Sequence, residues 1–267
     1  MLKQRIPTAI VLVAIVLTAL FTENSIYWRA LISLAIAIGF WEWLRFCEIT
    51  KPITKAIGYI LFGSVLYLLQ TGYFPIELVI YSACVLWLML LVFTMTSMLD
   101  FLHSSVCKLL VGVAVLSLSG WIIIELKSIE NGHLWVLCFM ASIWAADVGA
   151  YFVGKRYGQT KLAPKVSPGK TVEGMLGGVG FMLVVYLPVL FYFFDFNAAL
   201  FLLITLVITT LVSVGGDLFE SKMKRFCGLK DSSQILPGHG GVLDRVDSLL
   251  SGVPFFTLGL LILGYIK

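Results

Sequence analysis

The chain has 267 residues, of which 60% are hydrophobic and only 13% are charged, and its mean hydropathy is +0.99. This composition excludes a soluble globular domain, and the formal net charge of +4 decides nothing by itself. Apolar runs of about 18 or more residues recur along the chain, and a bilayer core takes roughly 20 helical residues to cross. Backbone polar groups in lipid must bond internally, and the alternating pattern of a membrane β-barrel is missing. We therefore expect an all-α, polytopic integral membrane protein.

Taken in chain order, the apolar runs predict about nine transmembrane helices. Lys3 and Arg5 precede the first run, and no small-residue cleavage site follows it, so we expect a membrane helix rather than a signal peptide. The five cysteines are scattered and form no CxxC pair, which argues against a disulfide framework or a zinc site. The predicted spans cover residues 6–21, 26–44, 56–73, 76–99, 109–126, 134–153, 174–194, 198–218 and 248–266.

The distribution of basic residues predicts the orientation. With the N-terminus in the cytoplasm and nine spans, 16 of the 19 Lys and Arg residues fall in cytoplasmic segments. Only Arg29, Lys127 and Lys267 fall outside, which is the bias that the positive-inside rule describes. Eight spans would place one of two strongly basic loops on the wrong side. We expect residues 1–130 to form a scaffold of membrane helices and residues 131–267 to form a catalytic membrane region whose site faces the cytoplasm.

Asp147 lies inside the sixth predicted span, where a charged side chain is costly and usually marks a pathway or a functional site. The alternative is a carboxylate near the interface that a neighbouring helix satisfies. Asp147 stands about six residues before the basic pair Lys155 and Arg156, roughly 9 Å along a helix. The position therefore favours a site near the cytoplasmic face.

The basic segment 161–173 contains Gly169, Lys170 and Thr171, but Pro164 stands where a phosphate-binding P-loop would need its first glycine. We expect Ser167 to be the N-cap of the seventh helix, with Pro168 at its first position. The free N–H groups of that helix, with Lys170 and Thr171, would then form an anion site. An ordinary basic loop is the alternative, and this segment alone does not decide between them.

Charged residues of both signs concentrate at the end of the chain. Asp217, Glu220, Ser221 and Lys224 share one face of a helix that extends from the eighth span, and Gly228 is a plausible end for it. A glycine-rich turn then leads into the last helix, on which two further acids, at positions 244 and 247, share a face. Oxygen ligands at one interface suit Mg²⁺, which takes one or two carboxylates together with substrate phosphates.

The segment 221–247 resembles the signature of the phosphatidate cytidylyltransferases (CDP-diacylglycerol synthases), of the bacterial inner-membrane type. The resemblance rests on the spacing Ser221-x-x-Lys224-Arg225-x4-Lys230-Asp231-x4-Leu236-Pro237-x-His239-Gly240-Gly241-x-x-Asp244-Arg245-x-Asp247. It extends back through Asp217, residues 165–171 and residues 146–151. The N-terminal half is similar only in hydropathy.

The resemblance implies an enzyme that converts CTP and phosphatidate into CDP-diacylglycerol and pyrophosphate with Mg²⁺, in phospholipid biosynthesis. Membrane lipids are expected partners and nucleic acids are not, and the oligomeric state stays open between a monomer and a homodimer. We predict catalytic roles for Asp217, Asp244, Asp247, Lys224, Arg225 and His239, with Asp217, Asp244 and Asp247 as metal ligands. We predict substrate contacts from Asp147, Lys165, Ser167, Lys170, Thr171, Glu220, Ser221, Lys230, Asp231, Gly240, Gly241 and Arg245.

Three alternatives compete with this interpretation. A CTP-dependent lipid kinase would use the same nucleotide but transfer its terminal phosphate. A transporter would show polar residues at mid-membrane and paired broken helices in two related halves, whereas the polar groups here gather at one face. A hydrolase built on Ser221, His239 and Asp244 would need a nucleophile elbow of the G-x-S-x-G kind, which the sequence lacks.

Overall fold

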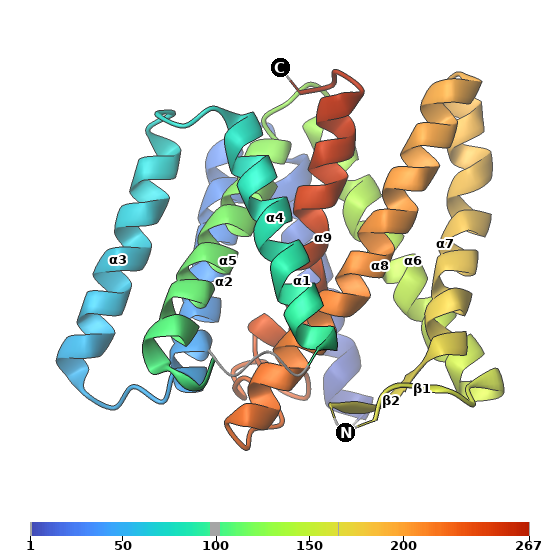
Figure 1. The fold of residues 1–267 in the computed structure, drawn as a ribbon. Helices are drawn as coiled ribbons and strands as arrows, with labels where there is room; N and C mark the ends of the chain where they lie inside the picture. Colours follow the sequence, from blue (N-terminus) through green and yellow to red (C-terminus); the bar gives the residue numbers. More distant parts are fainter. Residues whose placement is uncertain (1, 97–101, 165, 267) are drawn as a thin grey trace.

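The computed structural model describes residues 2–96, 102–164 and 166–266, and this part forms nine helices and one short β-hairpin (Figure 1). The predicted fourth span, 76–99, therefore ends in residues outside the described part. The helices are α1 Leu2–Phe21, α2 Ser25–Phe46, α3 Pro52–Gln70, α4 Ile76–Met95, α5 Ser105–Leu126, α6 Gly132–Tyr157, α7 Val172–Phe193, α8 Phe196–Phe226 and α9 Leu243–Ile262. Strands β1 Lys161–Ala163 and β2 Ser167–Thr171 pair antiparallel.

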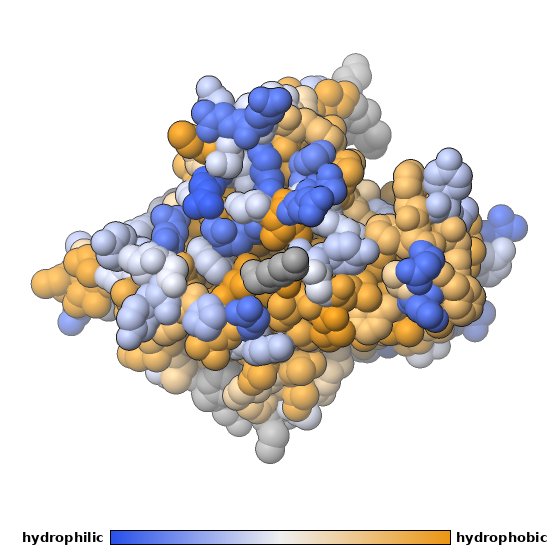
Figure 2. All heavy atoms as spheres, turned by 90° about the horizontal axis from the view of Figure 1, so that it is seen from above, coloured by the Kyte–Doolittle hydropathy of each residue, from blue (hydrophilic) through white to orange (hydrophobic). Residues whose placement is uncertain are grey.

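The helices form one bundle whose periphery is apolar, as expected of helices that face lipid. Seven of them, α3 to α9, are long and apolar enough to cross a membrane, and α1 contributes the shorter apolar segment Pro7–Phe21. Large hydrophobic side chains point outward, for example Tyr67 on α3 and Val184 on α7, which are 71% and 72% exposed. Seen along the helices, much of the rim is hydrophobic and hydrophilic residues lie in patches (Figure 2). The predicted multi-pass, helical membrane fold is confirmed.

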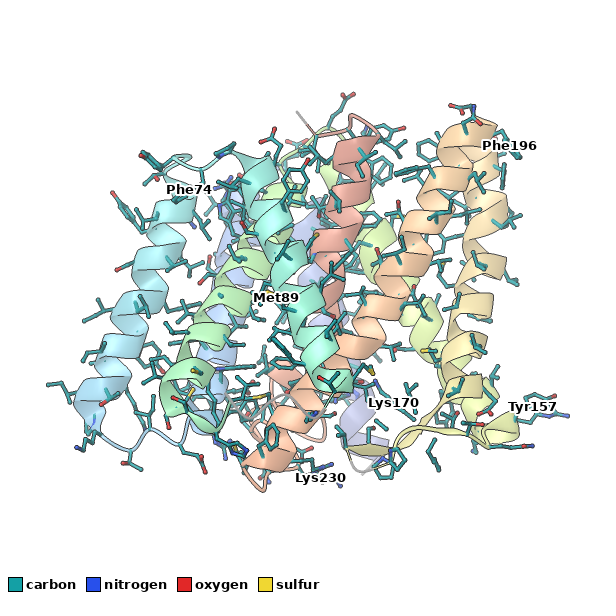
Figure 3. All side chains as sticks on the ribbon, in the orientation of Figure 1. Phe74, Met89, Tyr157, Lys170, Phe196 and Lys230 are labelled. Atoms are coloured by element: carbon teal, nitrogen blue, oxygen red, sulfur yellow. The ribbon has the colours of Figure 1, made fainter. Side chains whose placement is uncertain are left out.

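The two ends of the bundle differ in character. The N-terminus, the β-hairpin and the loop between α8 and α9 lie at one end, and the C-terminus lies at the other (Figure 1). Lys170 and Lys230 stand at the first end, while Phe74 and Phe196 stand at the opposite end (Figure 3). The two basic loops that were predicted to share a side of the membrane thus lie at one end of the bundle.

Close helix crossings surround the charged end. A Cβ atom at Gly178 of α7 would lie 2.6 Å from the Ala146 carbonyl oxygen of α6, so only glycine allows this approach. A Cβ at Gly216 of α8 would lie 3.1 Å from the Asp247 carbonyl oxygen of α9 and would also overlap the Ser251 side chain. These glycines bring α6 close to α7, and α8 close to α9, next to Asp147 and Asp217 respectively.

Helix α8 is longer than a membrane span requires. It has 31 residues, or about 46 Å at the rise of an α-helix, whereas the hydrocarbon core is roughly 30 Å thick. Its last turns carry the predicted site residues and end at Phe226, and Gly228 follows with a positive φ of 65°. The predicted end of this helix at Gly228 is therefore confirmed to within two residues.

The predicted start of the seventh helix is wrong. Ser167 lies in strand β2, and α7 begins at Val172 with Thr171 as its N-cap, whose hydroxyl accepts a bond of 3.1 Å from Gly174 N–H. Antiparallel pairing of Lys161 with Thr171 extends the segment, and the residue before a proline favours an extended backbone in any case. The helix N-terminus thus stands four residues later than expected.

Candidate active site

The charged face at the end of α8 forms as the spacing predicted. Ser221 Oγ donates to Asp217 Oδ1 at 3.2 Å, and Lys224 Nζ pairs with Glu220 Oε2 at 2.8 Å, each pair four residues apart. Glu220 is 3% exposed, and its other oxygen, Oε1, has no hydrogen-bond partner among the described residues. A buried carboxylate oxygen of this kind is costly unless a cation or a proton reaches it.

The hairpin and α6 add charges to this face. Lys170 of β2 forms an ion pair with Asp217 Oδ2. Asp147 of α6 interacts electrostatically with Lys170, Asp217 and Arg245, so three helices and the hairpin converge on one cluster. The predicted proximity of Asp147 to the basic end is thus confirmed.

Asp247 joins the same cluster from α9. The close crossing at Gly216 sets the α9 backbone against α8, and Asp247 interacts electrostatically with Asp217, Glu220 and Lys170. Neighbouring carboxylates repel one another, so this arrangement needs nearby positive charge or a proton shared between Asp247 and Glu220. Lys170 supplies part of this positive charge. The site therefore combines carboxylates that could bind a cation with basic side chains that could bind an anion.

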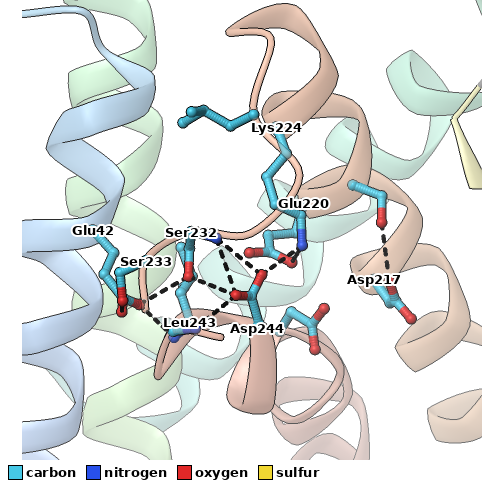
Figure 4. A network of polar contacts seen from close by, with 12 residues as sticks. Glu42, Asp217, Glu220, Lys224, Ser232, Ser233, Leu243 and Asp244 are labelled. Atoms are coloured by element: carbon cyan, nitrogen blue, oxygen red, sulfur yellow. Dashed lines mark hydrogen bonds and ion pairs between the residues drawn. The ribbon is translucent and has the colours of Figure 1, made fainter. Parts of the chain in front are cut away.

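Asp244, by contrast, is held by a complete set of donors (Figure 4). Its carboxylate accepts from Lys224 Nζ at 2.6 Å, from Ser232 N–H at 3.0 Å, from Ser232 Oγ at 2.9 Å and from Gly241 N–H at 2.8 Å. Two carboxylate oxygens offer about four lone-pair positions, so these donors occupy them. The side chain of Asp244 is 8% exposed, against 32% for Asp217.

Glu42 of α2 is a polar residue beside the site that sequence reasoning missed. It is fully buried, and it accepts hydrogen bonds from Ser232, Ser233 and the start of α9. The available signal was its charge inside a predicted span, which is the same signal that singled out Asp147.

The remaining predicted residues lie around the cluster rather than in it. Lys230 and Asp231 line a separate cavity of about 430 Å³, next to Arg45 of α2. Arg225 donates to the carbonyl groups of Leu229 and Val166, and Thr171 caps α7. Among the described residues, no hydrogen bond or ion pair joins Ser167 or His239 to Asp217, and Nδ1 of His239 is buried without a hydrogen-bond partner there. Lys165 lies outside the described residues. Gly240, with φ of 84°, packs against the Asp244 carboxylate, and the N–H group of Gly241 donates to Asp244 Oδ2.

The carboxylates of the cluster are compatible with the predicted Mg²⁺, although they do not form a complete ligand shell. No group of three or more His, Cys, Asp or Glu side chains within the described ranges forms a ready-made metal site. Mg²⁺ usually binds one or two carboxylates and completes its shell with water and substrate phosphates. The half-exposed Asp217, the adjacent Asp247 and the unpartnered oxygen of Glu220 fit that requirement. The fully bonded Asp244 fits it less well.

Comparison with known proteins agrees with the motif. The model of the cytidylyltransferase family matches residues 3–263, so the similarity also covers the N-terminal half, beyond hydropathy alone. The chain is 36% identical to a phosphatidate cytidylyltransferase of Haemophilus influenzae, covering 96% of this chain and 98% of the relative. It is 35% identical to that of Pseudomonas aeruginosa (96% of each chain) and 34% identical to that of Bacillus subtilis (95% of this chain, 96% of the relative). The chain belongs to the cytidylyltransferase family.

Proposed function

We propose that this protein transfers the cytidylyl group of CTP to phosphatidate in the bacterial inner membrane, releasing pyrophosphate and leaving CDP-diacylglycerol in the bilayer. The observation that carries the proposal is the cluster of Lys170, Asp217, Asp247 and Arg245 at one end of a membrane bundle, in a chain of this family. Basic side chains and carboxylates together are what a reaction between two phosphate groups needs.

The chemistry does not need a dedicated general base. A phosphate oxygen of phosphatidate attacks the α-phosphorus of CTP, and the bond between that phosphorus and the pyrophosphate oxygen breaks. Because the second pKa of a phosphate monoester is about 6, the nucleophile is already largely ionised near neutral pH. In this proposal, Lys170 and Arg245 bind the negative phosphates and hold them in line.

Mg²⁺ is the proposed cofactor, with Asp217 and Asp247 as its protein ligands and Glu220 as a neighbouring carboxylate. When bound, the ion would neutralise charge on the attacking and leaving oxygens. Asp244 is better placed to orient Lys224 and the loop before α9 than to bind the ion, since its lone pairs accept four donors. The basic character of this end supports a cytoplasmic orientation, because cytoplasmic segments carry the excess of Lys and Arg.

The test uses purified protein in detergent with a mixture of phosphatidate and diacylglycerol, Mg²⁺, and CTP labelled on either the α- or the γ-phosphate, so that a phosphate nucleophile and a lipid alcohol are both present. We expect the α-label to enter the lipid and the γ-label to appear in pyrophosphate, and we expect chelation of Mg²⁺ to stop both. Entry of the γ-label into lipid would instead identify a CTP-dependent lipid kinase. A folded protein that transfers neither label would contradict the proposal and leave a transport role as the alternative.

A further inference from the structure

The side chain of Glu42 connects two distant parts of the chain. It lies on α2 with no exposed surface, and its hydrogen-bond donors come from residues 190 to 201 positions further along. Oε1 accepts from Val242 N–H at 3.0 Å and from the Ser233 hydroxyl. Oε2 accepts from Leu243 N–H at 2.6 Å and lies 3.2 Å from the Ser232 hydroxyl, whose single proton it shares with Asp244 Oδ2. Each carboxylate oxygen therefore binds one backbone N–H group and one serine.

These contacts provide the missing cap of α9. The first N–H groups of a helix have no partners within the helix, and the N-cap residue Val242 has no side-chain hydrogen bond to offer. Glu42 supplies the acceptors from another helix, and its negative charge suits the positive end of the helix dipole. The position of the first turn of α9, which carries Asp244, thus depends on a residue of α2.

Ser232 links Glu42 to the site. Its hydroxyl lies between Glu42 Oε2 and Asp244 Oδ2, and its N–H donates to Asp244. Its carbonyl oxygen accepts a bond from Nη1 of Arg45, which stands one turn after Glu42 on α2. A Cβ at Gly241 would overlap both the Ser232 hydroxyl and the Glu42 carboxylate, so the loop backbone lies directly against this pair.

We infer that Glu42, assisted by Arg45, is a positioning residue of the active site: it fixes the 228–242 loop and the start of α9, and through them Asp244 and Lys224. Its kinetic consequence rests on the proposed function, while its structural consequence does not. This role requires a carboxylate, because a neutral isostere cannot accept hydrogen bonds on both oxygens.

The isosteric change Glu42→Gln shows why the charge state matters. A carboxylate only accepts, whereas an amide replaces one oxygen by an NH₂ group that only donates. A serine hydroxyl can rotate and accept from that NH₂, but a backbone N–H cannot. Either amide orientation therefore leaves Val242 N–H or Leu243 N–H facing a donor, and loosens the first turn of α9.

Hydrogen–deuterium exchange with peptide resolution tests the structural part. In Glu42→Gln, we expect faster exchange in peptides covering residues 229–246 and unchanged exchange in α3 and α6. Arg45→Ala, at an exposed position that should leave folding intact, should produce a smaller change in the same peptides. Glu77→Gln is the matched control, since Glu77 lies in the first turn of α4 at the opposite end of the bundle.

Turnover tests the kinetic part. A displacement of about 1 Å at a reacting group can cost roughly 10²-fold, so we expect Glu42→Gln to lower turnover by about 10- to 100-fold and Glu77→Gln to leave it unchanged. Equal turnover in wild type and Glu42→Gln, unchanged loop exchange, or a uniform rise in exchange over all helices would overturn the inference. A wild-type protein that makes no lipid-bound CMP would refute the proposed function instead, and the exchange result would still decide the role of Glu42.

Discussion

Asp217 and Asp244 are both acids near the ends of membrane helices, but their side chains have different surroundings. Asp217 is half-exposed and pairs with Lys170, a residue that a phosphate group could draw away. Asp244 is buried among four donors that belong to the protein itself. At the scale of single residues, two aspartates with the same side chain therefore have different roles because their surroundings differ. We expect Asp217 to bind the ion and phosphate, and Asp244 to align the loop.

Replacement of Asp217 by Asn should lower turnover while leaving the fold intact. The change keeps the shape but removes the charge that pairs with Lys170, and loss of one preorganised electrostatic group costs roughly 10²–10³-fold. Turnover should be measured as a function of Mg²⁺ concentration, and we expect the variant to need more Mg²⁺ than wild type. Glu23→Gln, in the exposed turn between α1 and α2, serves as the control. Normal turnover in well-folded Asp217→Asn would exclude Asp217 from the site.

Replacement of Gly241 by Ala should disturb the site through sterics alone. The added Cβ would overlap the Ser232 hydroxyl and the Glu42 carboxylate, which cannot retreat without breaking their hydrogen bonds. Overpacking of this kind typically costs about 1–3 kcal/mol, so we expect a lower melting temperature in detergent and reduced turnover. The matched control is Gly180→Ala in α7, where a Cβ meets nothing within 4 Å and alanine suits a helix better than glycine. Equal effects of the two changes would contradict the proposed contact.

At the scale of elements, the sequence predicted the features that depend on residues close together in the chain. The apolar runs predicted the helices, and the four-residue spacing after Asp217 predicted the pairs that form on α8. The predicted start of α7 was wrong because Ser167 and Thr171 are both good N-cap residues, and Pro168, which suits the first helical position, favoured Ser167. Pairing of β2 with β1 decided between them, and Glu173 secures the junction by accepting from the N–H groups of Gln159 and Thr160.

The role of Glu42 could not be predicted from a local sequence pattern. It stands between two tryptophans in an apolar run, and its partners lie 190 or more residues away, so only the tertiary fold brings them together. Single members of the Asp217 cluster were predictable, because Asp217 and Glu220 share a helix face and Asp147 is a charge inside an apolar span, but their meeting with Lys170 and Arg245 depends on the tertiary fold. The division into an N-terminal scaffold and a C-terminal catalytic region stays a prediction, and the bonds of Glu42 and Arg45 join the two parts.

At the scale of the whole molecule, basic residues such as Lys170 and Lys230 lie at the end of the bundle that carries the β-hairpin and the loop between α8 and α9 (Figure 3), and the orientation in the membrane is a prediction from the basic residues. Single cysteines at Gln234 and Tyr73, in a cysteine-free background, should react with an impermeant maleimide from opposite sides. Gln234 lies in the loop before α9, and Tyr73 is 80% exposed at the other end, next to Phe74 (Figure 3). We expect Tyr73→Cys to react in intact spheroplasts and Gln234→Cys to react only in inverted vesicles. The reverse pattern would refute the cytoplasmic orientation.

The excess length of α8 has a consequence for how such an enzyme meets its substrate. Because α8 is longer than the hydrocarbon layer is thick and its last turns carry the site, we expect the site at the edge of that layer, where a lipid presents its phosphate while its acyl chains stay in the bilayer. The encounter then takes place in two dimensions. The quantity that governs its rate is the mole fraction of phosphatidate in the surrounding leaflet, whereas the nucleotide is governed by its concentration in water.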